Sequence, residues 1–309
     1  MRILRSICGA AALSLPLLTC DTYAITTVSN LTYTFITDSP FPYYRVARVD
    51  LYIVSVSGSI VPDTSAGNAS FVTLASPHKK INVLSLQNGL HEELGSVALP
   101  TGIITAVRMV IDTDSSSITL KDGRVLTGSS TPGIHWQSSA GRPTLNALIN
   151  EEISVPLQGG LVVIDYDVGQ AFIPPQEVDP SSTDSGFIFS PVMRAVDANR
   201  SGWISGTVIA QSLNGPPVED ASLRLYLGNP SNPENTWSVM GTAKSASDGR
   251  FRFASVTRTA WWADNHGHDG ETYIVTVDPP PNSGLSRTVV TNIVVQAAVG
   301  TGLGSIILP

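Results

Sequence analysis

The chain has 309 residues, a formal net charge of −7 and a hydrophobic content of 42%. The acidic balance argues against nucleic acid or an anionic membrane surface as a partner, because both attract basic patches. The hydrophobic content is high enough to fill cores and excludes a disordered chain. The length predicts two domains of ordinary size, and the 26 glycines and 21 prolines predict many turns.

The N-terminus has the layout of a secretory signal peptide. Arg2 and Arg5 precede an apolar run over residues 7–18, which is too short to span a membrane. No later apolar run reaches roughly 18 residues, so we expect no transmembrane helix. The sequence therefore predicts an exported protein.

Two cleavage sites compete at the end of this segment. Cleavage of residues 1–24 as a signal peptide would release a soluble periplasmic or extracellular protein. Cleavage of residues 1–19 as a lipoprotein signal would leave Cys20 as a lipidated first residue. The chain has two cysteines, and Cys8 lies inside the apolar run, so Cys20 would be the sole cysteine of the mature protein. This favours lipidation, and hence a membrane contact made through a lipid anchor.

Loss of the signal peptide also makes the protein more acidic. Of the 18 basic residues, Arg2 and Arg5 would be removed, so that 16 basic residues face 25 acidic ones for a net charge of −9. No basic cluster offsets this charge, so we expect no nucleic acid partner.

The first long strand of the mature chain is predicted over residues 46–56. Apolar residues alternate there with polar ones, which is typical of a half-buried strand. Pro40 and Pro42 precede it and restrict the backbone to an extended corner. We expect this strand to lie near the centre of a sheet, with Arg48 and Asp50 on its solvated face.

Shorter elements follow up to residue 196. Residues 81–86 are predicted to form a single short helix, and residues 103–112 a strong strand. Asp122 and Gly123 lie between two short apolar runs and predict a hairpin. Further strands are expected at residues 28–36, 70–74, 133–136, 151–157, 160–166 and 187–196.

A polar, turn-forming stretch over residues 197–202 marks the expected domain boundary. Seven short strands separated by turns follow it, which is typical of a small β-sandwich. They are predicted at residues 203–211, 221–227, 237–244, 251–254, 272–277, 289–295 and 304–308. The sequence thus predicts a mainly β protein, with two antiparallel β-sandwich domains, over residues 28–197 and 201–309, after a cleaved signal peptide.

Several separate motifs in the first domain occur in the order of a known family. They are T-D-S-P-F-P-Y at residues 37–43, L-P-T-G at 99–102, D-Y-D-V-G-Q at 165–170 and F-S-P-V-M-R at 189–194. With these motifs the domain resembles the DUF4382 family of bacterial lipoprotein domains. The resemblance implies a protein of the bacterial cell envelope and brings no known activity with it.

The second domain resembles the carboxypeptidase-regulatory or transthyretin-like β-sandwich. The motifs that carry the resemblance are I-S-G-T-V at residues 204–208, D-G-R-F-R-F at 248–253 and Y-I-V-T-V at 273–277. Carbohydrate-binding-like modules share this fold, and a fold does not by itself define a function. The chain departs from the pattern at residues 258–271, where a longer loop replaces a short proline–glycine step.

Candidate metal ligands lie close together in that loop. Imidazole and carboxylate ligands suit zinc or another transition metal ion, although a site on one loop needs further ligands. The candidates are Asp264, His266, His268 and Asp269. The alternative is a solvated polar loop that binds nothing.

Tryptophans beside these residues suggest a different site. Trp261 and Trp262, with Trp237, could present flat ring faces to a sugar or a peptide. The alternative is a tryptophan packed into the sandwich. Carbohydrate or a protein segment is therefore the expected kind of ligand if this surface binds one.

No catalytic constellation stands out. The sequence contains no G-x-S-x-G, no H-E-x-x-H and no glycine-rich phosphate loop. Asp165 and Asp167 could serve glycoside hydrolysis only if the fold placed them in a cleft. We therefore expect a non-enzymatic envelope protein that acts as a structural or ligand-binding module, without a cofactor. The alternatives are carbohydrate binding through the second domain and, less favoured, metal binding or hydrolysis by the 264–269 loop.

Overall fold

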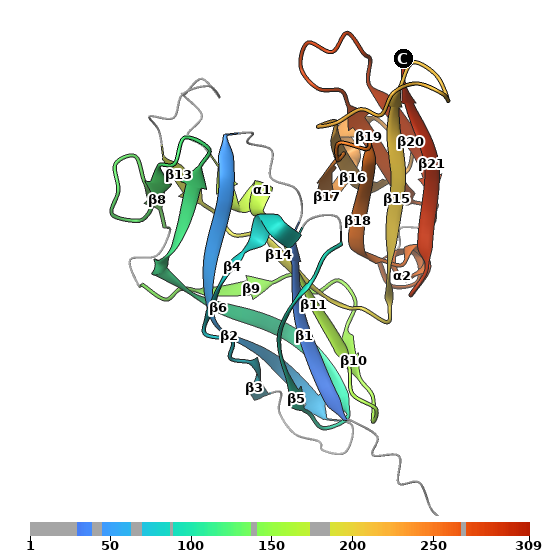
Figure 1. Cartoon of the computed structure of the whole chain (residues 1–309). Coiled ribbons are helices and arrows are strands. Elements are labelled where there is room, and N and C mark those ends of the chain that lie inside the picture. The colour runs from blue at the N-terminus through green and yellow to red at the C-terminus, as the bar shows by residue number, and fades with distance from the viewer. Residues whose placement is uncertain are drawn as a thin grey trace, which may run out of the picture.

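The computed structural model describes residues 30–38, 45–62, 70–86, 89–136, 141–173, 186–266 and 270–309. Its strands fall into two groups, and within the described ranges no sheet contains strands from both (Figure 1). The two hydrophobic cores are also separate, one built from residues between 36 and 195 and the other from residues between 204 and 308. We call the two units the N-terminal domain (residues 30–197) and the C-terminal domain (residues 201–309).

The N-terminal domain is built from two larger sheets and one small sheet, with the orders β10-β6-β2-β3, β14-β11-β1-β5 and β12-β13-β8. Strands β4, β7 and β9 extend the first sheet by pairing with β2 or β6. Its strands are β1 (Leu31–Asp38), β2 (Val46–Pro62), β3 (Ser70–Ala75), β4 (Lys79–Asn82), β5 (Glu92–Ala98), β6 (Gly102–Leu120), β7 (Val125–Leu126), β8 (Ile134–His135), β9 (Thr144–Ala147), β10 (Ile153–Val155), β11 (Leu161–Tyr166), β12 (Phe172–Ile173), β13 (Phe187–Phe189) and β14 (Met193–Asp197). Two short helices, η1 (Val83–Leu86) and α1 (Val168–Ala171), complete it.

Strand β2 lies inside its sheet, between β6 on one side and β3 and β4 on the other, so the predicted central position is confirmed. A register shift near its start turns Val46 into the core. The prediction of a solvated Asp50 is wrong, because only 8% of this residue is exposed and Arg48 donates hydrogen bonds of 2.8 and 3.2 Å to its carboxylate. The Pro40 and Pro42 corner lies outside the described residues.

Other elements of this domain differ from the sequence prediction in informative ways. Residues 81–86 begin as the end of β4 and form only one 3₁₀ turn, since Ile81 pairs with β2. The strands predicted over residues 151–157 and 160–166 join different sheets, and β11 runs parallel to β1. The strand predicted over residues 187–196 divides into β13 and β14 around Pro191, which has no N–H to donate.

The hairpin predicted at Asp122-Gly123 is confirmed. Strand β6 turns into β7 there, with Ile118 opposite Leu126. Gly123 has a φ of +89°, a conformation that side chains disfavour, which explains why a glycine occupies this turn.

The C-terminal domain contains all seven predicted strands, in two sheets with the orders β18-β15-β21 and β17-β16-β19-β20. The antiparallel prediction fails for β15 and β21, which run parallel. The reason is that β21 follows β20, which belongs to the other sheet. The chain crosses between the sheets and enters β21 in the same direction as β15. The elements are β15 (Ser201–Ala210), β16 (Ser222–Gly228), η2 (Glu234–Thr236), β17 (Ser238–Lys244), β18 (Arg250–Thr257), α2 (Thr259–His266), β19 (Thr272–Asp278), β20 (Thr288–Ile293) and β21 (Gly300–Leu308).

Helix α2 corrects the expectation of a loop over residues 258–271. The Thr259 hydroxyl accepts a hydrogen bond of 2.8 Å from the Val295 N–H, and the Thr259 N–H donates one of 2.9 Å to the Val295 carbonyl. These two bonds hold the start of the helix against the chain that follows β20. No helix in the described ranges is long and apolar enough to cross a membrane.

The two domains follow one another along the molecule (Figure 1). The end of β1 at Asp38 lines a cavity together with Tyr273 of the C-terminal domain. The start of β1 at Leu31 is therefore roughly 23 Å away from that contact, at about 3.3 Å per strand residue. Strand β21 runs parallel to β15, away from the N-terminal domain, so the first and last strands begin and end far from the interface.

Candidate functional site: the polar interface between the domains

The two domains meet through polar side chains rather than through a shared core. One side of the contact is the sheet β14-β11-β1-β5, and the other is formed by the edge strands β17 and β18 of the sandwich. Asp165 and Arg194 contribute from the first side, while Gly241 and Thr257 contribute from the second. The sheet edges that would otherwise be open to other strands are thus partly covered.

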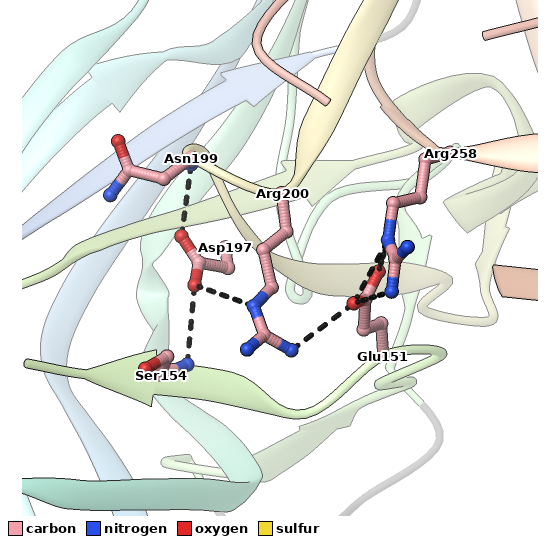
Figure 2. A network of polar contacts seen from close by, with 6 residues as sticks. All are labelled: Glu151, Ser154, Asp197, Asn199, Arg200 and Arg258. Carbon is pink, nitrogen blue, oxygen red and sulfur yellow. Dashed lines mark hydrogen bonds and ion pairs between the residues drawn. The ribbon is translucent and has the colours of Figure 1, made fainter. Parts of the chain in front are cut away.

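Glu151 is the centre of an interdomain ion-pair network (Figure 2). Its side chain is only 8% exposed. Arg258 of the C-terminal domain donates to its carboxylate at 2.8 Å from one terminal nitrogen and at 3.2 Å from Nε. Arg200, in the connection between the domains, donates a further bond of 3.2 Å. The hydrogen bonds that Arg258 donates to Glu151 raise the pKa of Arg258, and charge-assisted bonds of this kind are among the stronger ones in proteins.

Asp197 organises the connection itself. Its carboxylate accepts hydrogen bonds from the Asn199 N–H at 2.9 Å and from the Ser154 N–H at 3.2 Å (Figure 2). Its backbone carbonyl accepts one from the Arg200 N–H at 3.0 Å, which closes a turn. Burial raises the pKa of Asp197, and these bonds oppose that rise. The polar stretch predicted as a boundary is therefore a tight and fully bonded turn.

A second polar cluster lies farther along the interface. Asp165 and Arg194 are cross-strand neighbours on β11 and β14, and both line a small cavity with Arg252 of β18. Burial raises the pKa of Asp165 to about 7, against the opposing effect of the positive charge of Arg194. Within the described ranges, the buried Nε of Arg252 has no hydrogen-bond partner. Arg252 instead packs over the ring of Trp203, 4.8 Å from its centre.

Trp262, proposed from sequence as part of a ligand platform, is only 9% exposed. Its indole N–H donates a hydrogen bond of 2.9 Å to the hydroxyl of Tyr273, which in turn donates to the Thr257 carbonyl at 2.7 Å. Trp261 is partly buried, with its ring centre 4.9 Å from that of Trp262. These two rings pack against the C-terminal core, as the alternative interpretation proposed.

Trp237 packs on the face of the β17-β16-β19-β20 sheet that points away from the C-terminal core. Its ring packs on Tyr226, 5.8 Å between centres, and its indole N–H donates to the Asn229 carbonyl at 3.0 Å. Tyr226 alternates with the core residues Leu225 and Leu227 and therefore points outward. The three tryptophans do not come together on one surface.

The residues proposed as metal ligands are only partly covered by the structure. Asp264 lies on α2 and is exposed. His268 and Asp269 lie outside the described residues, as do the side chain of His266 and the whole of residues 1–29, including Cys20. No group of three or more potential metal ligands occurs in the part of the chain that the structure describes.

The residues that matter most at the interface were not predicted as a site. Glu151 looked like the start of a strand and Arg258 like the start of a loop. They lie 107 positions apart, and no linear pattern pairs them. The sequence indicates part of this interface only through the polar stretch over residues 197–202, which predicts that Asp197 and Arg200 lie between two domains.

The comparisons with known proteins give a family and a set of distant structures. Residues 32–191 match the family described as "Domain of unknown function (DUF4382)". Among solved structures, the minor pilin GBS52 of Streptococcus agalactiae is 8% identical, with 90% of this chain and 95% of that chain covered and a TM-score of 0.22. The shaft pilin SpaA of Lactobacillus rhamnosus GG is 10% identical, with 90% and 97% covered and a TM-score of 0.25. The major pilin BcpA of Bacillus cereus is 8% identical, with 90% and 69% covered and a TM-score of 0.21.

No curated protein matches the sequence significantly. The family match spans more than half of the chain and includes the strands from β1 to β13. This protein is a member of the DUF4382 family.

Proposed function

We propose that this protein is a non-enzymatic structural module of the bacterial envelope, in which two β domains form one stiff unit tethered near its N-terminus. The observation that carries the proposal is the network in which Glu151 binds Arg258 and Arg200 across the domain boundary. These charged groups are bonded to one another between two separate cores.

The connection between the domains supports stiffness. Only three residues, 198–200, separate β14 from β15. The N–H groups of Asn199 and Arg200 are both bonded to Asp197, and Gly202 follows where a Cβ atom would lie 2.4 Å from the Gln296 carbonyl oxygen. A short and bonded turn restricts the relative rotation of the domains more than a flexible linker does.

The direction of the strands supports a role as a spacer. The chain enters the N-terminal domain at the end of β1 that is remote from the interface, and β21 ends on the remote side of the C-terminal domain (Figure 1). A tether at the first end would hold the C-terminal domain away from the membrane.

The tether that we propose is a lipid on Cys20. Ten residues lie between Cys20 and Leu31, and a chain of this length spans at most about 35 Å. The acidic charge of the mature chain disfavours direct adsorption to an anionic membrane. A lipid would therefore be the main contact with the membrane.

Metabolic labelling with palmitate tests the tether. The wild-type protein should carry label and sediment with membranes, whereas Cys20→Ala should lose the label and become soluble. Cys8→Ala should behave like the wild type if processing precedes Cys20. Label that persists in Cys20→Ala, or a wild-type protein found only in the soluble fraction, would contradict the lipid anchor. Neither result would bear on the stiffness of the two domains, which is tested separately.

Distance measurement between spin labels tests the stiffness. Labels on cysteines introduced at Lys121 and Asn214, both exposed and in different domains, should give one narrow distance distribution in a background with Cys8 and Cys20 replaced by alanine. Glu151→Gln should broaden that distribution. The matched control is Glu234→Gln, which breaks an ion pair with Arg287 inside one domain and should leave it narrow. A broad distribution in the protein with Glu151 intact would contradict a rigid spacer.

A further inference from the structure

One end of the N-terminal domain carries no charged side chain in the described part of the chain. This end, which we call the base, consists of residues 30–31, 61–62, 98–102 and 155–159. The strand registers bring these residues together, since they pair Leu31 with Ala98, Pro62 with Gly102, and Gly102 with Val155. The base is the end at which β1 begins, away from the C-terminal domain (Figure 1).

The charge-free zone extends back from the base along every strand that reaches it. No Asp, Glu, Lys or Arg occurs in residues 30–37, 51–62, 94–107 and 153–164, although these four residue types make up 14% of the chain. On β10 the first charged residue, Glu152, comes three residues before Val155, which is about 10 Å along an extended chain. Residues 63–69, which include Asp63, lie outside the described residues. A surface helix buries its apolar side about 5–10 Å into the headgroup region of a bilayer, and the described base enters to that depth without burying a charge.

Exposed apolar side chains lie at the tip of the base. Leu157 is 68% exposed, and Pro100 and Pro156 are exposed beside it. The Gly159 N–H donates a hydrogen bond of 2.9 Å to the Pro156 carbonyl, which closes a turn with Leu157 at its tip. A Cβ atom on Gly159 would lie 2.1 Å from the Leu31 carbonyl oxygen, so this turn packs directly on the start of β1. The two prolines have no N–H group that would lose water on contact with lipid.

An exposed leucine alone does not indicate a partner, because single apolar side chains are common on protein surfaces. Leu213, at the far end of β15, is 73% exposed and lies in a similar turn, which the Gly215 N–H closes with a bond of 2.8 Å to the Ser212 carbonyl. At that end, however, the turn between β17 and β18 carries the exposed residues Asp248 and Arg250. Only at the base is the exposed leucine combined with uncharged neighbouring turns in the described structure.

The base is also the end at which the chain enters the domain. Ten residues separate Cys20 from Leu31, so a lipid on Cys20 holds the base within about 35 Å of the membrane. The acidic charge of the mature chain lies on the rest of the molecule, which anionic headgroups repel.

From this placement we infer that the base lies in the headgroup region of the membrane to which the protein is tethered, with Leu157 as its central apolar contact. The inference depends on the proposed tether near the N-terminus and adds an orientation to it. The protein stands on the membrane on the base, with the C-terminal domain pointing away.

Hydrogen–deuterium exchange on a chemically tethered protein tests the inference. The mature protein that begins at Cys20 is coupled through this thiol to a maleimide lipid, in vesicles of phosphatidylcholine and phosphatidylethanolamine. Cys20 is then the only thiol, because Cys8 precedes it. We expect peptides that cover residues 98–102 and 156–160 to exchange more slowly in the tethered protein than in the free protein. The peptide that covers residues 211–216, around Leu213, should exchange equally in both.

Variants make the test specific. Leu157→Asp should reduce the protection by about tenfold, because burial of a leucine shifts an equilibrium by roughly that factor or more. Leu213→Asp is the matched control, an exposed leucine in a similar turn, and should keep the protection.

The inference is overturned if the peptides of the base exchange equally in the tethered and the free protein, or if folded Leu157→Asp keeps the protection. Protection that appears without vesicles as the protein concentration rises would assign the base to self-association and would also overturn it. A cell that does not lipidate Cys20 would give no palmitate label but the same exchange result, because the chemical coupling replaces the cellular lipid. The tether and the orientation on the membrane therefore fail in different experiments.

Discussion

Single side chains determine how the two domains are coupled. Glu151 makes its bonds almost completely out of solvent, whereas the ion pair of Glu234 with Arg287 is on the surface. An exposed pair contributes little, because water screens it and both long side chains must be ordered. A covered carboxylate with two arginine partners contributes more, and its loss removes the acceptor of the hydrogen bonds that Arg258 donates.

Replacing Glu151 should therefore destabilise the interface. We expect Glu151→Gln to lower the free energy of unfolding by about 1.5–3 kcal/mol, the range for hydrogen bonds to charged groups. Glu234→Gln should change it by less than about 0.5 kcal/mol. Urea denaturation followed by circular dichroism measures both, and equal effects of the two substitutions would contradict the role given to Glu151.

Asp165 should make stability depend on pH in a defined direction. Its pKa is about 7 in the folded protein and about 3.8 when unfolded, so the folded state holds the proton more tightly. The stabilisation is complete below about pH 4 and is lost as the pH rises through 7, by up to about 4 kcal/mol.

Asp165→Asn should flatten this dependence and be more stable than the wild type at about pH 8, because the amide does not ionise. Urea denaturation at several pH values measures the difference. Asp248→Asn, at an exposed hairpin turn, is the control and should keep the wild-type profile. An unchanged slope in Asp165→Asn would show that another group causes the pH dependence.

Among the elements, α2 packs at the end of the sandwich that contacts the N-terminal domain. The helix follows β18 directly, so Arg258 lies between the last residue of that strand and the first of the helix. Trp262 fixes the helix to Tyr273 on β19, and Tyr273 bonds back to the end of β18 at Thr257. The position of Arg258, and with it the ion pair to Glu151, depends on this packing.

Removing the Trp262 ring should accordingly destabilise the C-terminal domain. Trp262→Ala should cost about 3–5 kcal/mol, as large-to-small changes in cores do, and leave the Tyr273 hydroxyl with one bond fewer. Trp237→Ala, on the outer face, should cost less. Thermal unfolding monitored by tryptophan fluorescence compares them, and a Trp262→Ala protein as stable as the wild type would mean that the ring is not part of the core.

The whole molecule has two cores and one polar interface, and this predicts its unfolding behaviour. Domains with separate cores unfold as separate units when the contact between them is weak. We expect two calorimetric transitions that move apart as sodium gluconate is raised to about 1 M, since salt screens the partly exposed arginines. A single transition at every salt concentration would show that the interface couples the domains more strongly than its ion pairs explain.

Much of the fold could be predicted from the sequence. All seven strands of the C-terminal domain and the long strand at Val46 were visible as alternating patterns, and Asp122-Gly123 marked its hairpin. The failures concern pairing: β11 joins β1 in parallel and β21 joins β15 in parallel. The tryptophans of residues 261 and 262 were assigned to a loop because α2 has no clear apolar periodicity.

Most strands and the Asp122-Gly123 hairpin follow from local sequence, because side-chain alternation and turn chemistry depend on neighbouring residues. The sequence also determined the family, through motifs kept in order along the first domain. Long-range packing sets which strands share a sheet, buries Trp262 and brings Glu151 to Arg258. The physical reason is that these contacts join segments far apart in the chain, and they form only when two complete domains have placed their surfaces side by side.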